Sequence, residues 1–107
     1  MNSDIFESLE YRIESFYDRM NMLGVAVDEI EYDLSLIECF DVEMQLEELK
    51  SKIKTVRYRI IDISDEITIC EVFEKDIEEN LQEAIEVIEE EIKALEDYIE
   101  AIKKRYS

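Results

Sequence analysis

Apolar residues recur at alternating spacings of three and four along most of the chain, and no other feature of the sequence constrains the fold so strongly. Three such series can be followed, over residues 6–37, 46–70 and 81–102. This spacing places apolar side chains on one face of a helix, with the period of a coiled coil or a helical bundle. The sequence therefore predicts an all-α protein.

The phase of the apolar spacing shifts twice, and each shift is expected to separate two helices. The predicted helices cover about residues 4–38, 42–68 and 73–105. One helix over residues 46–102 would be about 85 Å long at about 1.5 Å per residue, which exceeds the length of ordinary globular helices. An antiparallel three-helix bundle, forming a single domain, is therefore favoured over a long helical coiled coil.

Local signals bear on the helix ends and on helix packing. Asp4 with Glu7 three residues later has the pattern of a capping box, and Asp41 is a candidate N-cap of the second helix. The only glycine, Gly24, leaves a break in the first helix as an alternative. Apolar residues beside the main series of the first helix predict contact with more than one neighbour or with a second subunit. These residues are Met22, Val25, Ala26 and Leu36.

A β-hairpin is the alternative to a helix over residues 56–72, because the segment is rich in β-branched residues. A helix–hairpin–helix order would resemble a subunit of prefoldin, a chaperone family whose helices form coiled-coil tentacles, and would imply an assembly role. The glycines usual in that hairpin are absent, and the helical spacing continues through the segment. The sequence therefore favours a helix, with a break or a short hairpin as the alternative.

The chain is strongly acidic. It has 30 Asp or Glu against 12 Lys or Arg, a net charge of −18, and 47% hydrophobic residues. A surface this negative repels phosphate, which argues against direct binding to nucleic acid or to an anionic membrane. No apolar run approaches the roughly 20 residues of a membrane span, and the first residues lack the basic segment of a signal peptide. We expect a soluble, cytoplasmic protein with enough apolar residues for a core.

The bases are concentrated between two acidic arms. Residues 49–61 contain no acid and five bases, Lys50, Lys52, Lys54, Arg57 and Arg59. In an antiparallel bundle these bases can pair with acids of the other two helices and so set the helix order. A contact with an acidic partner is the alternative interpretation.

The sequence lacks the residues that most enzymes and metal sites require. Without histidine there is no Ser–His or Cys–His pair and no Glu-x-x-His ligand set, and one glycine cannot form a phosphate-binding loop. Cys39 and Cys70 lack a metal-binding spacing and an activating base. We interpret them as one thiol at a turn and one buried thiol, with a disulfide as the alternative. The sequence predicts no enzyme activity, no cofactor and no metal.

The remaining acids form rows that are expected on outward helix faces, with Tyr11 and Tyr32 beside Asp18 on the outer side of the first helix. Carboxylates at helical spacing present closely spaced negative charges, as a phosphate backbone does. The predicted partner-binding residues are Tyr11, Asp18, Asp28, Glu29, Tyr32, Asp33, Glu78, Glu79, Glu89, Glu90, Glu91, Glu96 and Asp97.

Together these features predict a non-enzymatic protein-interaction module. The specific hypothesis is an inhibitor that occupies the basic nucleic-acid-binding surface of a partner protein, by analogy of charge and size with anti-restriction and anti-CRISPR proteins. The alternative is a structural coiled-coil scaffold, adaptor or prefoldin-like assembly protein. In that case apolar faces mediate self-association, for example as a homodimer, and the acids only keep the protein soluble.

Overall fold

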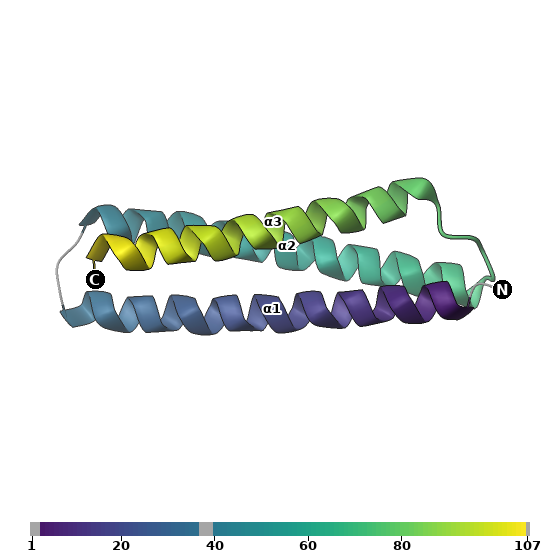
Figure 1. The fold of residues 1–107 in the computed structure, drawn as a ribbon, viewed down its shortest axis with the longest axis horizontal. Coiled ribbons are helices and arrows are strands. Elements are labelled where there is room, and N and C mark those ends of the chain that lie inside the picture. Colours follow the sequence, from purple (N-terminus) through teal and green to yellow (C-terminus); the bar gives the residue numbers. More distant parts are fainter. Residues whose placement is uncertain (1–2, 37–39, 107) are drawn as a thin grey trace.

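The computed structural model describes residues 3–36 and 40–106, and these form three α-helices (Figure 1). The helices are α1 (Ser3–Leu36), α2 (Phe40–Val72) and α3 (Glu79–Tyr106). α2 runs antiparallel to α1 and α3, which are parallel to each other, and each helix packs against both others. The bundle is elongated, with extents of 56 × 19 × 17 Å. The predicted all-α three-helix bundle is confirmed, and a single helix over residues 46–102 is wrong.

The apolar series of the three helices meet along the bundle axis and form the core. Among the described residues, every buried side chain is hydrophobic. Met20 of α1, Ile60 of α2 and Ile92 of α3 are each 0% exposed. Burying such faces gains about 25 cal/mol for each Å² of apolar area removed from water, and this gain holds the helices together.

The hairpin alternative for residues 56–72 is wrong, because the whole segment lies in α2. Its β-branched residues Val56, Ile60, Ile63 and Ile67 follow helical spacing and are buried in the core. Burial of one helix face therefore overrides the local preference of β-branched residues for strands.

The connection between α2 and α3 differs from the predicted one. α2 extends to Val72, beyond the predicted end at 68, because Cys70 is still buried in the core. α3 begins at Glu79, whereas the sequence predicts a start at 73. Phe73, expected to begin the third apolar face, is 67% exposed, whereas Ile77 packs partly buried against the core. Apolar spacing alone therefore does not locate this connection.

α2 ends at a residue with a left-handed backbone, Glu74, whose φ is 52°. The Glu74 amide donates to the carbonyl oxygen of Glu71 at 3.3 Å, and the Lys75 amide donates to that of Cys70 at 2.8 Å. This pair of bonds is a Schellman motif, which satisfies carbonyl groups at a helix C-terminus. Glycine is the usual residue at the left-handed position, but here a glutamate occupies it.

The other predicted helix ends shift slightly. α1 begins at Ser3 and α2 begins at Phe40, so Asp4 and Asp41 lie in the first helical turns and not at N-cap positions. At these positions the positive N-terminal end of the helix dipole stabilises their carboxylates. Residues 37–39 lie outside the described part of the chain. They include Ile37, Cys39 and the predicted end of the first helix at 38.

α1 continues through Gly24 without a break, so the alternative of a helix break at this glycine is wrong. A Cβ atom at Gly24 would lie 3.2 Å from Nη2 of Arg57 in α2. The same nitrogen donates a hydrogen bond of 3.2 Å to the backbone carbonyl of Met20. The glycine therefore gives the Arg57 side chain room to reach the backbone of α1.

Candidate protein-binding surface

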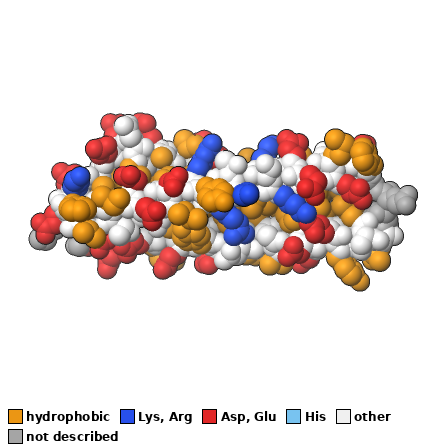
Figure 2. All heavy atoms as spheres, turned by 180° about the vertical axis from the view of Figure 1, so that it is seen from behind, with side chains coloured by type: hydrophobic (Ala, Val, Ile, Leu, Met, Phe, Trp, Pro, Cys, Tyr) orange, Lys and Arg blue, Asp and Glu red, His pale blue; other side chains and the backbone are white. Residues whose placement is uncertain are grey.

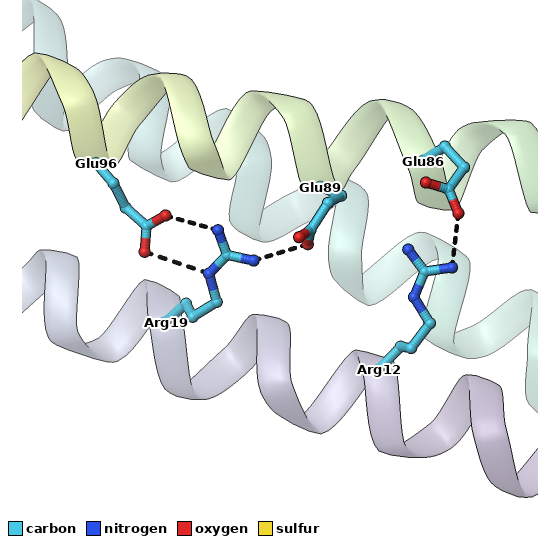
Figure 3. Close-up of polar contacts among 5 residues, drawn as sticks. All are labelled: Arg12, Arg19, Glu86, Glu89 and Glu96. Atoms are coloured by element: carbon cyan, nitrogen blue, oxygen red, sulfur yellow. Dashed lines mark hydrogen bonds and ion pairs between the residues drawn. The ribbon is translucent and has the colours of Figure 1, made fainter.

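Both basic residues of α1 turn toward α3 (Figure 3). Arg12 Nη1 lies 2.8 Å from Glu86 Oε1. Arg19 contacts two carboxylates, because its Nη1 donates to Glu89 at 2.7 Å while its Nε and Nη2 donate to Glu96 at 3.2 and 2.6 Å. The hydrogen bond with Glu96 is the main cause that raises the pKa of Arg19 above its ordinary value. A bidentate pair of this kind fixes orientation as well as charge.

The basic segment of α2 also pairs with the other helices. Lys50 pairs with Glu31 of α1, and Arg59 pairs with Glu91 of α3. The hydrogen bond with Glu31 raises the pKa of Lys50 above its ordinary value. Exposed pairs contribute about 0–1 kcal/mol each, so they select the helix order more than they stabilise the fold. These contacts support the interpretation that the basic segment pairs within the bundle.

The ion pairs change the interpretation of three predicted binding acids. The sequence predicts Glu89, Glu91 and Glu96 on outward faces, but each is half-buried and paired with an arginine of another helix. That prediction of an outward face is wrong, because a long arginine side chain reaches a carboxylate at the edge of the core. The predicted acids that are exposed are Asp18, Asp28, Glu29, Asp33, Glu78, Glu79, Glu90 and Asp97.

The outer face of α1 combines exposed apolar side chains with acids. We define this face as Tyr11, Asp18, Met22, Val25, Glu29, Tyr32 and Leu36, which follow spacings of three, four and seven on the side away from the core. Its apolar members are between 58% and 75% exposed. The sequence predicts a further neighbour for Met22, Val25 and Leu36, but neither α2 nor α3 covers them. Such an exposed row of apolar residues is typical of a binding surface.

The charge of this face has one sign within α1. Arg12 and Arg19 are the only bases in the described part of α1, and both are engaged with α3. One acid of this face, Glu29, contacts a base of another helix, because its Oε2 lies 3.7 Å from Nζ of Lys103 in α3. The face therefore presents carboxylates and apolar groups, which suits a positively charged partner.

The described residues contain no group of His, Cys, Asp and Glu that could hold a metal ion. None of the described helices is long and apolar enough to cross a membrane. Cys70 is a free, buried thiol. A hollow of about 400 Å³ between α2 and α3, lined by Thr55, Arg59 and Tyr98 among others, is an open groove.

Two acids meet across the α1–α2 contact. A hydrogen bond with the Glu71 side chain, followed by the negative charge of Glu71, raises the pKa of Glu10 above its ordinary value. When Glu10 is protonated its carboxyl group can donate to Glu71, whereas two ionised carboxylates repel each other. The contact is therefore unfavourable at neutral pH and becomes favourable when a proton is bound.

The free energy of unfolding should consequently rise as the pH falls from neutral toward the unfolded pKa of about 4.5. The folded state binds this proton before the unfolded state does, because the pKa of Glu10 is raised only in the folded protein. The stabilisation is absent above the folded pKa and complete below the unfolded value of about 4.5. Glu10→Gln should raise the melting temperature at pH 7 and flatten this part of the pH profile. Asp18→Asn, which also removes one exposed negative charge, should leave the slope in place; equal slopes for both variants would contradict the assignment.

The fold and the surface define a class of protein, an acidic antiparallel three-helix bundle with an exposed apolar row on α1. Comparisons with protein-family models, with curated proteins and with solved structures gave no match for this chain. Its function must therefore be argued from the surface itself.

Proposed function

We propose that the protein is a non-enzymatic interaction module whose outer face of α1 binds a basic surface on a partner protein. The observation that supports this proposal is the exposure of Tyr11 (75%), Met22 (73%) and Tyr32 (67%) among carboxylates on one helix face. Tyrosine and methionine are enriched at protein interfaces because they bury a large apolar area while part of the side chain can stay in contact with water.

The charge of the outer face of α1 also favours a basic partner surface. With both bases of α1 engaged by α3, the outer face of α1 attracts cations at long range and repels other acidic proteins. The apolar side chains then supply the contact area that persists when salt screens the charges. A partner with a basic surface that contains apolar pockets fits both features.

In its specific form, the proposal is that the partner surface normally binds nucleic acid and that this protein inhibits it. The exposed acids of this face, Asp18 and Glu29, present negative charges at helical spacing, as phosphates do along a strand. On α3 the exposed acids Glu90 and Asp97 provide a second, more distant row, whereas Glu89 and Glu96 are engaged with Arg19. We therefore assign the main contact to α1. The proposal includes a cytoplasmic location, with which the free thiol of Cys70 agrees.

The test is binding to partners recovered by affinity pull-down from lysate, eluted in rising salt. Asp18→Lys with Glu29→Lys should weaken binding by about tenfold or more and reduce its salt dependence, because each reversal removes an attraction and adds a repulsion. Glu90→Lys with Asp97→Lys makes the same change in net charge on α3 and should have an effect of about threefold or less. Tyr32→Ala with Met22→Ala should weaken binding without changing the salt slope.

Two results would overturn the proposal. Equal losses for the α1 and α3 variants would show that only net charge matters. Binding that does not depend on salt would exclude a basic partner surface. Recovery of partners that do not bind nucleic acid would refute the inhibitor form of the proposal and leave the interaction module.

A structural or assembly role is the second candidate, and one observation favours it. Apolar side chains are exposed on α2 as well as on α1, including Phe40 (71%), Tyr58 (59%) and Val72 (68%). Apolar rows on two helices suit contacts between several chains. A salt-resistant complex with another helical protein would support this role.

A further inference from the structure

The outer face of α2 carries a short row in which two apolar side chains lie between charged side chains of opposite sign. Lys54, Tyr58, Ile61 and Asp65 follow spacings of four, three and four, and all are exposed. Tyr58 is 59% exposed and Ile61 is 43% exposed. Figure 2 views the molecule from the side of α2 and shows basic side chains gathered near hydrophobic ones in the middle of this face, with acidic side chains toward its ends. This row differs from the outer face of α1, whose charged residues are all acids.

We propose that a second copy of this chain docks on this row, with the two α2 helices antiparallel and related by a two-fold axis. The axis crosses α2 midway between Arg59 and Ile60. Tyr58 and Ile61 are equally distant from that point, so Tyr58 of each copy lies level with Ile61 of the other. The inference uses a different face from the partner-binding surface and does not rest on the proposed function.

The charged residues of the row fit the same arrangement. Lys54 and Asp65 are also equally distant from the axis, so each lysine lies level with the aspartate of the second copy. Further out, Ser51 lies level with Thr68, and both are small, exposed residues that permit close approach of the helices. Because a two-fold interface repeats every contact, one register forms two Tyr–Ile contacts and two Lys–Asp ion pairs.

Net charge explains why this face, and not another, suits a second copy. Two chains of net charge −18 repel each other over most of their surfaces. Residues 49–61 contain five bases and no acid, and Lys50 and Arg59 among them neutralise acids of α1 and α3. The middle of α2 is therefore less negative than the rest of the surface, and two copies approach there with least repulsion. Two outer faces of α1 would instead place Asp18 and Glu29 against acids. The small apolar area on α2 is that of a transient dimer.

Sedimentation velocity of the full chain over a range of concentrations, at low and moderate salt, tests the proposal. Wild type should show a reversible monomer–dimer equilibrium. Lys54→Asp should raise the dimer dissociation constant by about tenfold or more, because it places two acids opposite each other. Asp65→Lys should raise it similarly by opposing two lysines. The double variant Lys54→Asp with Asp65→Lys should restore dissociation to within about threefold of wild type.

Asp65→Lys best separates the effect of net charge from that of the Lys54–Asp65 ion pair, because it makes the chain less negative and yet should weaken the dimer. Asp18→Lys on α1 makes the same change in net charge and should leave the dimer unchanged or stronger. Circular dichroism checks that each variant keeps its helical content. A wild type that stays monomeric, an Asp65→Lys variant that dimerises more tightly, failure of the double variant to rescue, or growth beyond a dimer would each overturn the proposal.

Discussion

Replacing Arg19 with methionine should lower the free energy of unfolding by about 2 kcal/mol, which is a substantial part of the stability of a small domain. The side chain of Arg19 is 25% exposed and makes its ion pairs with Glu89 and Glu96 of α3. Methionine keeps much of the length but leaves both carboxylates unpaired beside α1. The expected loss of free energy lies between the loss from breaking a buried ion pair and the loss from breaking an exposed one, because the two glutamates are about 40% exposed. Urea denaturation measures the change.

Arg12→Met is the matched control for this prediction. Arg12 also reaches from α1 to α3, but its one ion-pair contact is with Glu86, whose side chain is 65% exposed. We expect a loss of about 0.5 kcal/mol. Arg19→Lys should recover only part of the stability, because an ammonium group cannot form the bidentate contact with Glu96. Equal losses of unfolding free energy for Arg12→Met and Arg19→Met would show that the contact of Arg19 with two carboxylates adds nothing beyond a single exposed ion pair.

Glu74→Gly should raise the free energy of unfolding by about 1 kcal/mol, or the melting temperature by about 4–8 °C. Glu74 occupies the left-handed position of the Schellman motif with φ of 52°. A Cβ atom makes this conformation unfavourable, whereas glycine adopts it readily. Thermal unfolding followed by circular dichroism measures the shift.

Glu74→Ala separates the backbone effect from the charge. Alanine removes the acid next to the C-terminal end of the α2 dipole, which is worth a few tenths of a kcal/mol, but it keeps the Cβ atom. The glycine variant should therefore be clearly more stable than the alanine variant. If the two melt at the same temperature, backbone strain at Glu74 contributes nothing measurable.

The fold was largely predictable because one periodic pattern determines which face of each helix is buried. The spacing from Phe6 to Leu34 and from Leu46 to Cys70 predicts the residues that the core contains. The α2–α3 connection was not predictable in detail. Phe73 and Ile77 continue the apolar spacing, whereas the chain leaves the helix at Glu74, a residue without the usual preference for a left-handed backbone.

The candidate surface was predictable only in part. Tyr11, Asp18 and Tyr32 lie opposite the apolar series of α1, and helical geometry alone places them outward. The direction of Glu89 and Glu96 depends on which helix lies beside α3, and the apolar series does not contain that information. The useful signal was the pair Arg12 and Arg19, the only bases in the first 48 residues. Such isolated bases in an acidic segment are expected to form ion pairs with carboxylates on a neighbouring helix.

The positions of these two arginines also bear on the handedness of the bundle. The same three apolar faces are compatible with two mirror-related arrangements, in which α3 lies on one flank of the α1–α2 pair or on the other. In the observed one, α3 lies on the flank of α1 that carries Arg12 and Arg19 (Figure 3). In the other, the acids of α3 would meet the flank with Glu10 and Glu31, which here faces α2. The apolar spacing of the three helices does not distinguish the two arrangements, whereas the ion pairs of Arg12 and Arg19 favour the observed hand. This contribution of charge to the choice of hand should weaken as salt screens it.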